Sequence, residues 1–437
     1  MKSEPITYAC CSDISGKLRG KGFPATDFKK RLLKGVGWTP TNVQITCFDT
    51  IADSPFGSLG DLLLIPDAAT RTQLDFGSGS PVEDFVLGNV LHLDGSKWEC
   101  CTRAILQDAL DRLVAATGLT LFGTFEHEFT LQGAEQGKGL AFTAGGFRRE
   151  RAFAETLMAT LQAANITPDT FIREFGTDQF EITVTPTEGI SIADQGAILR
   201  EVVQIVAERF ARRASFSPLP VAGGTGNGVH IHMSFRDSSG IPATYDPAKP
   251  HGMNSAASAF IAGVLKHLPS IIAFTAPSVI SYQRLVPHRW SAAFNNLGAQ
   301  DREAAIRLCP ITTLNGADPH SQFNFEFRAA DATASPHLQL AAIVHAGVWG
   351  IEQNLPTPTP TAEDLSRLDL QELSNRGIER LPASLDIALD NLAHDQTVRS
   401  WFPDGFVEVY LAHKHFEISQ VAEMTKREQC AAYAEVY

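Results

Sequence analysis

The strongest constraint on the fold comes from residues 124–131, where polar and apolar side chains alternate. Such alternation predicts a β-strand with one face packed on a core. Side chains two residues apart share a face, so Glu126 and Glu128 are expected side by side, with His127 opposite them and without a role. Two neighbouring carboxylates repel each other unless a cation lies between them. Taken alone, such a pair is more often a solvated polar face, so its meaning depends on what the rest of the chain places beside it.

Composition and charge exclude several classes of protein. With 437 residues, 44% of them hydrophobic and 19% charged, the sequence is that of a globular protein long enough for two or three domains. Its net charge of −13 disfavours a nucleic-acid partner, although a local group of arginines can still bind a small anion. No uninterrupted apolar stretch reaches the roughly 20 residues of a transmembrane helix, so no membrane partner is expected.

The cysteines indicate the compartment. There are seven, an odd number, and none forms a CxxC pair. This pattern disfavours a disulfide framework or a zinc cage and favours a reducing environment. The N-terminus shows no signal peptide. We therefore expect a cytoplasmic protein.

Two domains are expected, residues 1–98 and residues 99–437. In the first, alternating or apolar runs predict strands at 43–48 and 61–67. The loop between them, 49–58, is rich in Asp, Ser, Pro and Gly, the residues typical of turns.

The second domain is expected to mix helices and strands. Helical spacing of apolar residues is found at 102–117, 149–164, 190–214, 254–267 and 336–353. Strand-like alternation is found at 171–175, 179–184, 229–235 and 322–328. A Pro-Thr repeat at 355–360 predicts a surface linker.

Five glutamates and one histidine stand on predicted strands among aromatic or β-branched neighbours. They are Glu126, Glu128, Glu174, Glu181, His230 and Glu326. Charged groups in apolar surroundings are costly unless they are paired or bind a metal. An oxygen-rich set with a single imidazole suits Mg²⁺ or Mn²⁺ better than zinc. The set could hold two or more ions around a shared phosphate, although each residue taken singly is more often structural.

Four arginines accompany these acids: Arg284, Arg302, Arg307 and Arg328. Metal-binding carboxylates together with arginines are typical of phosphoryl transfer, because cations bridge phosphates and guanidinium groups bind phosphate or carboxylate through paired hydrogen bonds. No Walker A or kinase motif is present, so a nucleotide must be held in another way. Arg302 and Arg307 could alternatively belong to a solvated helix face.

Taken in order, these segments resemble the glutamine synthetase superfamily. The matching motifs are an ExE strand at 126–128, an E…GQxE hairpin at 174–181, a Gly-rich-to-HxHxS strand at 226–234, an SYxRLVP loop at 281–287, an R-x4-R pair at 302–307, an ExR strand at 326–328 and a D-x-x-G-x-x-R-G-K segment at 13–21. The matches cover most of the chain in the right order, although no single motif is decisive.

The resemblance implies an α+β fold, with a small β-grasp-like N-terminal domain and a large glutamine-synthetase-type catalytic α/β domain that has a curved antiparallel sheet. It also implies homo-oligomers built from hexameric rings, often paired into dodecamers, with sites shared between subunits. In that family ATP phosphorylates the γ-carboxylate of glutamate, and an amine then displaces phosphate to give an amide. The cofactors would be ATP and Mg²⁺ or Mn²⁺.

The resemblance also implies a role for each site residue. One metal would be held by Glu128, Glu174 and Glu181, and the other by Glu126, His230 and Glu326. Arg284 and Arg328 would bind the substrate carboxylate and the transferring phosphoryl group. Arg302 and Arg307 would face the ATP phosphates, His232 and Ser234 the nucleotide, and Glu128, Thr225 and Gly226 the glutamate.

The sequence departs from the family on the acceptor side. Members that use ammonia carry a glutamate three residues after the proline of the RLVP loop, where this chain has Trp290. An indole in place of a carboxylate removes a cation site and leaves an apolar wall, which favours an organic amine. Trp290 and Phe294 indicate a small alkylamine or an aromatic amine rather than a polyamine, with His288 and Arg289 at the entrance. The alternative is that the loop is shifted and that another acid takes the place of the missing glutamate.

Three smaller departures concern neighbouring parts of the site. In the family an acid from the N-terminal loop assists at the acceptor, and Asp49 or Asp53 would supply it here, although the family's DGSS pattern is kept only loosely at 49–52. Asn324 stands where an arginine usually precedes the ExR glutamate, which removes one phosphate contact. The segment 225–228 reads T-G-N-G in place of N-G-S-G, so the glutamate-binding loop is altered in detail.

Three hypotheses follow. The first is an ATP-dependent ligase that joins the γ-carboxyl group of glutamate to an organic amine. The second is an ordinary ammonia-dependent glutamine synthetase, against which Trp290 argues. The third is a non-catalytic structural or regulatory relative, against which the six retained carboxylate and histidine positions argue.

Overall fold

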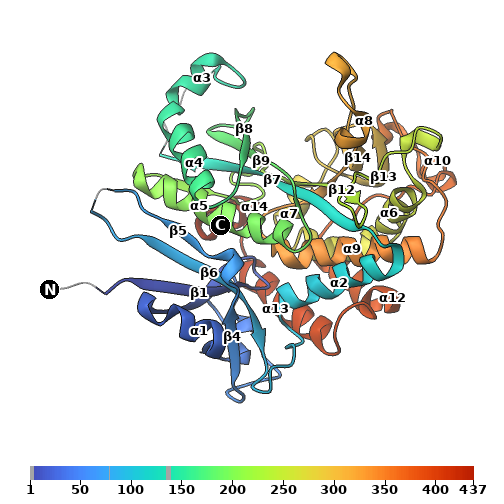
Figure 1. Ribbon diagram of the computed structural model, residues 1–437. Coiled ribbons are helices and arrows are strands. Elements are labelled where there is room, and N and C mark those ends of the chain that lie inside the picture. The colour runs from blue at the N-terminus through green and yellow to red at the C-terminus, as the bar shows by residue number, and fades with distance from the viewer. Residues whose placement is uncertain (1–3, 78, 134–138) are drawn as a thin grey trace.

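A six-stranded sheet forms the N-terminal part of the protein (Figure 1, blue). The computed structural model describes residues 4–77, 79–133 and 139–437. The strands of this sheet are β1 (Ile6–Ser12), β2 (Leu18–Pro24), β3 (Val36–Trp38), β4 (Leu62–Pro66), β5 (Thr72–Leu74) and β6 (Glu83–Leu91). Strand β1 runs parallel to β6, the other pairs are antiparallel, and helix α1 (Phe28–Lys34) packs on β4. The predicted β-grasp-like architecture is confirmed.

The strand predicted at 43–48 is wrong. Pro40–Gln44 is a 3₁₀ helix, and the residues after it form a loop closed by a single bridge between Ile45 and Ile51. Both Val43 and Gln44 are buried, which a strand with one solvated face would not allow. The side chain of Gln44 donates to the carbonyl of Val409 at 3.1 Å, so a partner distant in sequence sets the local conformation.

A nine-stranded sheet forms the centre of the catalytic part, in the order β13-β14-β15-β12-β7-β9-β8, with β10 and β11 also paired to β7. Its strands are β7 (Thr120–Gln132), β8 (Pro168–Arg173), β9 (Gln179–Val184), β10 (Thr187–Glu188), β11 (Arg213–Ser215), β12 (Val229–Arg236), β13 (Phe294–Ala299), β14 (Ala304–Leu308) and β15 (Phe325–Ala330). All pairs are antiparallel except β13 with β14, so the sheet is mixed at that edge. The long strand β7 carries the residues from which the sequence prediction began.

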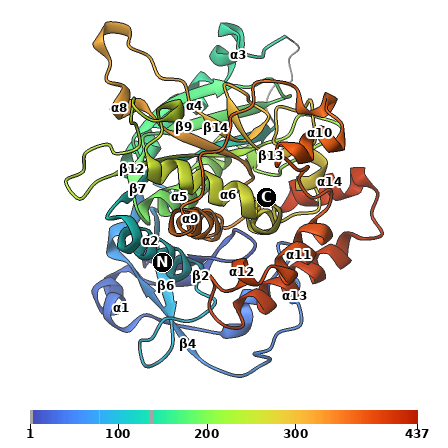
Figure 2. The same ribbon diagram turned by 90° about the vertical axis from the view of Figure 1, so that its right-hand side faces the viewer.

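Helices surround this sheet and form the C-terminal part. They are α2 (Thr102–Thr117), α3 (Ala144–Arg149), α4 (Arg151–Ala163), α5 (Ser191–Arg209), α6 (Ser255–Thr275), α7 (Ser281–Arg284), α8 (Pro319–Gln322), α9 (Pro336–Glu352), α10 (Leu370–Asn375), α11 (Leu385–His394), α12 (Gln396–Arg399), α13 (Phe406–Val421) and α14 (Lys426–Val436). Figure 2 shows α11 to α13 gathered beside α6 and α9. The helix predicted at 190–214 is shorter than expected, because residues 213–215 instead form β11.

Helix α6 is longer than the predicted 254–267 because it continues through Pro269. A proline removes the hydrogen bond to the carbonyl four residues earlier. Here that carbonyl, of Leu265, accepts from the side chain of Asn295 at 3.4 Å. By length and hydropathy α6 could span a membrane, but 83% of its apolar window is buried inside the protein, as in a core helix.

Helices α6 and α9 approach each other through glycines. A Cβ atom at Gly263 would lie 2.2 Å from the carbonyl oxygen of Ala346 and 2.7 Å from Cα of Gly350. A Cβ atom at Gly350 would lie 2.2 Å from the carbonyl oxygen of Ala259. The two backbones are therefore in direct contact, and no larger residue fits between them without separating the helices.

The turn between β1 and β2 joins the two parts of the protein. The carboxylate of Asp13 accepts a 2.6 Å hydrogen bond from Arg19 Nε, which closes the turn. Arg200 on α5 donates to the carbonyl of Gly16 at 3.0 Å. A side chain at Gly16, where φ is +72°, would meet the carbonyl of Ala334 at 2.6 Å. The D-x-x-G-x-x-R-G-K segment therefore anchors the N-terminal sheet on the catalytic part.

The glycine contact predicts the effect of one added methyl group. Gly263→Ala should destabilise the protein by about 1–3 kcal/mol, because the overpacked helices must move apart. Gly145→Ala on α3 is the matched control, since its nearest neighbour, Thr143 Oγ1, is 3.7 Å away. Urea unfolding followed by circular dichroism measures both. Equal stability of the two variants would contradict the close packing of α6 on α9.

Candidate active site

One face of the catalytic sheet collects the charged residues. Strand β7 buries Phe125, Phe129 and Leu131 on its opposite face and leaves Glu126 and Glu128 half-buried on this one. The alternation therefore separates a core face from a polar face, as predicted. His127 lies on the core face between Phe125 and Phe216, where burial lowers the pKa of its imidazole to about 3 and keeps it neutral.

Strand register places the partners of the two glutamates. Glu126 lies opposite His230 on β12, and Glu128 lies opposite Glu181 on β9. On the other side of β12, His232 lies opposite Glu326 on β15. Residues that are up to 200 positions apart in sequence thus share one surface, because cross-strand neighbours sit about 4.5–5.5 Å apart.

Two groups of these residues have the geometry of a metal site. The first contains Glu126, Glu181 and His230, and the second contains Glu126, His232 and Glu326. Within each group the ligand atoms all lie within 4.8 Å of one another. Glu126 belongs to both groups, and His230 Nδ1 lies 2.8 Å from Glu126 Oε1. His232, which the resemblance assigned to the nucleotide, stands among the candidate ligands.

Glu128 and Glu174 flank these groups. Glu128 Oε2 accepts from the backbone N–H of Gly228 at 2.6 Å and from Gln179 Nε2 at 3.4 Å. Gln179 also donates to the carbonyl of Gly226 at 2.7 Å, so it fixes the glycine loop against the carboxylates. Glu174 follows β8 directly, in the turn before β9.

Crowding of carboxylates shapes the charge of the site. Burial and the neighbouring charges of Glu126 and Glu128 raise the pKa of Glu181 to about 10, so it holds a proton at neutral pH. Burial and Glu128 also raise the pKa of Glu174. Burial would raise the pKa of Glu126, but hydrogen bonds from His230 and His232 outweigh it and hold that pKa well below its ordinary value. A divalent cation would relieve this repulsion, and the oxygen-rich donors with imidazole fit Mg²⁺ or Mn²⁺.

Glu326 is the most buried of the acids, and arginines hold it. Arg307 Nη1 donates to Glu326 Oε2 at 2.8 Å, and Arg328 Nη1 donates to Oε1. Burial opposes ionisation, but Arg328 and the histidines hold the pKa of Glu326 at about 2. Two arginines assigned to phosphate by resemblance thus also contact a candidate metal ligand. Arg307 lies on strand β14, so it is not on a solvated helix face.

Arg284 lies at the end of α7 behind the glycine loop. Its Nη2 donates to the carbonyl of Ala330 at 2.7 Å, and among the described residues its buried Nε has no partner. A Cβ atom at Gly226 would lie 2.6 Å from the Arg284 side chain. Only glycine therefore lets the loop lie directly on this arginine.

A cavity of about 380 Å³ opens beside these residues. It brings together nine residues singled out from the sequence: Glu128, Glu174, Thr225, Gly226, His230, Arg284, His288, Arg289 and Trp290. It also contains Phe175 and Ser291, for which the sequence gave no functional signal, and Gln179, the glutamine of the E…GQxE motif. Phe294 does not line it and, with the exposed Arg302, borders a separate hollow behind the Trp290 loop.

The two residues that the resemblance assigned to the nucleotide, His232 and Ser234, lie on β12. His232 Nδ1 is 2.9 Å from Asn324 Oδ1 and 3.6 Å from Cys309 Sγ, and its Nε2 is 3.6 Å from Glu126. Asn324 thus accepts from Nδ1–H and turns Nε2 toward the carboxylates. The hydroxyl of Ser234 donates to the carbonyl of Phe122 at 3.3 Å. Asn324, which stands where the family usually has an arginine, therefore orients His232.

Neither Asp49 nor Asp53 lines the cavity of its own chain. Asp49 has φ of +56°, and its side chain is 77% exposed, with a 3.3 Å contact to Arg19. Arg19 and Lys17 also donate to the carbonyls of Thr46 and Cys47, so the base of this loop is firmly held. The loop presents Asp49 outward from the protein.

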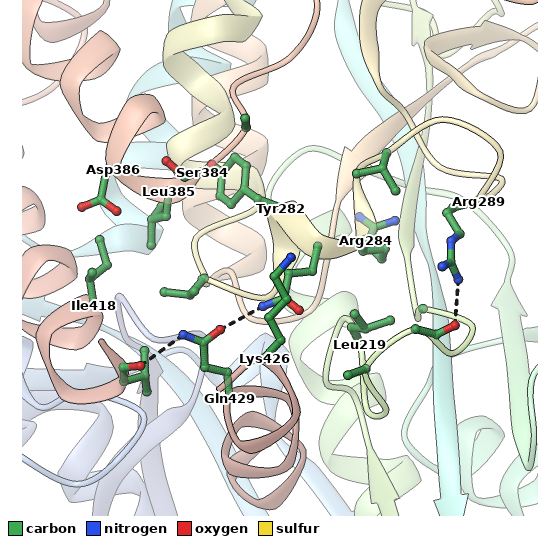
Figure 3. Close-up of a pocket in the computed structure, with 18 of the residues that line it drawn as sticks. Leu219, Tyr282, Arg284, Arg289, Ser384, Leu385, Asp386, Ile418, Lys426 and Gln429 are labelled. Atoms are coloured by element: carbon green, nitrogen blue, oxygen red, sulfur yellow. Dashed lines mark hydrogen bonds between the residues drawn. The ribbon is translucent and has the colours of Figure 1, made fainter. Parts of the chain in front are cut away.

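A second groove of about 790 Å³ lies on the other side of α7 and the glycine loop (Figure 3). Helices α13 and α14 form its floor, where Gln429 accepts from Gln283 at 2.9 Å. Arg289 crosses toward the loop and donates to the carbonyls of Gly223 and Gly224 at 3.0 and 2.9 Å. The outer part of the glycine loop is thus fixed by this arginine, with open space beside it.

Comparison with known proteins identifies the class. The model of the glutamine synthetase catalytic domain matches residues 99–433, and the model of the glutamine synthetase N-terminal domain matches residues 4–98. The chain therefore belongs to the glutamine synthetase family. It is an enzyme, an ATP-dependent ligase, and ligases of this family use ATP with a divalent metal ion.

Individual relatives give a finer comparison. A gamma-glutamylpolyamine synthetase from Streptomyces coelicolor is 29% identical over 96% of this chain and 91% of its own length. A glutamate–methylamine ligase from Methyloversatilis universalis is 27% identical over 95% of this chain and 93% of its own length. A solved structure described as a novel glutamine synthase homolog is 37% identical, has a TM-score of 0.92, and covers 100% of this chain and 99% of its own.

The protonated Glu181 predicts how metal binding depends on pH. Uptake of Mg²⁺ or Mn²⁺ should release a proton, because Glu181 must ionise to become a ligand. Its pKa is raised relative to the unfolded chain, so the metal-free protein should lose stability as pH rises toward about 10, and a bound ion should restore it. Calorimetry in buffers of different ionisation enthalpy measures the released proton.

Glu181→Gln should abolish most of this proton release and weaken metal binding. Glu155→Gln is the control, since Glu155 is an exposed acid on α4 whose one ion pair among the described residues is with Arg151. Metal binding by the unaltered protein without any proton release would show that Glu181 is already ionised.

Proposed function

We propose that the protein phosphorylates the γ-carboxylate of L-glutamate with ATP and couples it to an organic amine, giving a γ-glutamyl amide, ADP and phosphate. The observation that carries this proposal is Trp290, which borders the same cavity as Glu128, Gly226 and Arg284. An indole at this place offers an ammonium ion no carboxylate partner, but it offers an apolar amine a surface to pack on. The similar amine ligases support the same reading.

Two balanced steps make up the reaction. An oxygen of the γ-carboxylate attacks the γ-phosphorus of ATP, which forms γ-glutamyl phosphate and releases ADP. The nitrogen of the amine then attacks the γ-carbon, loses a proton and expels phosphate. Phosphorylation is needed because an unmodified carboxylate oxygen is a poor leaving group, whereas phosphate is a good one. Cationic groups around the phosphoryl oxygens stabilise the developing charge.

Residues of the chain supply binding and charge for these steps. Arg284 lines the cavity and would bind the substrate carboxylate, with Gly226, Thr225 and Glu128 around the glutamate. Arg302, Arg307 and Arg328 would stabilise the phosphoryl groups, and His232 and Ser234 would lie toward the nucleotide. The glutamates Glu126, Glu128, Glu174, Glu181 and Glu326, with His230, would hold the divalent ions that neutralise the phosphates.

An ammonia-dependent glutamine synthetase is the second candidate. It would require another acid to replace the missing glutamate at the acceptor. Within the described cavity the acids are Glu128 and Glu174, both of which the proposed metal sites use. The third candidate, a non-catalytic relative, would have no physical reason to keep costly carboxylates crowded together.

Amine preference tests the proposal directly. Phosphate release should be faster with methylamine, isopropylamine or aniline than with ammonium, when glutamate, ATP and Mg²⁺ or Mn²⁺ are present. Trp290→Glu should raise kcat/KM for ammonium about tenfold relative to organic amines, because one charged hydrogen bond is restored. Leu314→Glu, a similarly exposed change outside the cavity, is the control. Best turnover of the unaltered enzyme with ammonium would contradict the proposal, and no phosphate release with any amine would favour the non-catalytic candidate.

We further propose that the enzyme assembles into rings in which one subunit's Asp49 completes the cavity of the next. The support is that the loop of Asp49 is held at its base and points outward, while the cavity of its own chain has no such acid. Asp49 would help to deprotonate the amine, with Asp53 as the alternative.

Subunit mixing tests this arrangement. Asp49→Ala and Glu128→Ala homo-oligomers should each be nearly inactive, but co-assembled subunits should regain activity, because one shared site then contains neither change. The same mixing experiment with Asp53→Ala in place of Asp49→Ala shows which of the two acids completes the shared site. Failure of mixed oligomers to regain activity, with assembly verified by light scattering, would argue against shared sites.

A further inference from the structure

Two large aromatic side chains are exposed at the mouth of the 380 Å³ cavity. Trp290 is 65% exposed and Phe175 is 70% exposed, although most aromatic side chains of this protein are buried. Exposed apolar surface around a cavity with polar groups at its base is typical of a ligand site. The pair comes from separate elements, the β8–β9 turn and the loop after α7.

Trp290 is held in a conformation that a bulky residue rarely adopts. Its φ is +52°, and that of His288 is +63°, both in the left-handed region. One carboxylate holds both: Glu303 Oε1 accepts from the N–H of Trp290 at 2.9 Å, and Oε2 accepts from the N–H of His288 at 3.0 Å. Backbone strain of this kind persists only where the surroundings enforce it, and it is concentrated at functional sites.

The loop that carries Trp290 also contacts residues proposed for phosphoryl transfer. Arg328 donates to the carbonyl of Trp290 at 3.3 Å while it also pairs with Glu326. The hydroxyl of Ser291 donates to the carbonyl of Arg284 at 2.7 Å. The backbone at Trp290 is thus held relative to both Arg284 and the candidate metal ligands.

Phe175 is fixed just as firmly on the other side of the cavity. Its N–H donates to the adjacent carboxylate of Glu174 at 3.2 Å. The next residue, Gly176, donates to Gln179 Oε1 at 2.9 Å, and a Cβ atom there would lie 3.0 Å from Thr225. The tight turn packs its glycine on the glutamate loop and leaves the ring of Phe175 at the mouth of the cavity.

We propose that Phe175 and Trp290 form an aromatic clamp around the acceptor, that the acceptor is a primary amine carrying an aromatic ring, and that Glu303 is a positioning residue for Trp290. This inference rests on the proposed glutamate–amine ligation. The two rings line one cavity with Gly226 and Arg284, which are proposed to bind glutamate, so they would contact the apolar body of the amine. A flat ring can stack on both aromatic side chains, whereas a methyl or isopropyl group can cover only a small part of them.

The test compares kcat/KM for benzylamine, aniline, isopropylamine, methylamine and ammonium. The unaltered enzyme should prefer a ring-bearing amine. Phe175→Ala and Trp290→Ala should each lower kcat/KM for that amine about tenfold, since aromatic contacts are lost, and should affect methylamine much less. The KM values for glutamate and ATP should stay unchanged. Phe147→Ala, which truncates an exposed aromatic residue on α3 outside the cavity, should alter none of these values.

Glu303 requires a separate test, because it acts through the loop. Glu303→Gln keeps the size of the side chain but can no longer accept from both N–H groups with two oxygens. It should raise KM for the ring-bearing amine and leave KM for ATP unchanged. In a Trp290→Ala background the same change should have no further effect on amine preference, because the residue that it positions is gone. An additive effect there would overturn the positioning role.

The outcomes separate this inference from the proposed function. If methylamine or isopropylamine is the best substrate, glutamate–amine ligation stands and the clamp for a ring-bearing acceptor is wrong. The clamp is also wrong if Phe175→Ala lowers the activity with every amine by the same factor. If ammonium is the best substrate, both proposals fail.

Discussion

Repulsion between crowded carboxylates is the constraint on which the site depends. Strand β7 carries Glu126 and Glu128 on one face, its neighbours β9 and β12 add Glu181 and His230, and β15, which pairs with β12, adds Glu326. Without a cation the sheet can tolerate this only by keeping one acid protonated and by pairing others with histidine or arginine. A bound divalent ion would remove the same cost, so this face of the sheet suits cations.

The acceptor side depends on this sheet through a few polar contacts. Arg328 bridges Glu326 and the carbonyl of Trp290, and Glu303 holds the backbone of the same loop. The residues proposed for phosphoryl transfer and the residue proposed to face the amine are therefore parts of one hydrogen-bonded structure. Such coupling can align the amine with the activated carboxylate, because the position of one side constrains the other.

Local sequence patterns predicted regular elements well where burial followed a simple period. Helix α2 has the bounds read from its apolar spacing, and β9 those read from its alternation. The predictions were wrong where partners distant in sequence decided. Gln44 is drawn inward by Val409, so an alternating segment becomes a 3₁₀ helix, and Asn295 lets α6 continue past Pro269. At the edge of the sheet β13 and β14 pair in parallel, whereas the resemblance implied an antiparallel sheet.

The sequence by itself determined the family, the class of enzyme and the acidic face of β7 that resembles a metal site, because motif order and side-chain alternation are local properties of the chain. Tertiary structure alone decided which side chains share a space. It grouped His232 with Glu126 and Glu326, replaced Phe294 by Phe175 at the cavity, and turned Asp49 away from its own site. These relations depend on strand register and loop conformation, which are fixed by contacts between residues distant in sequence and leave no local pattern.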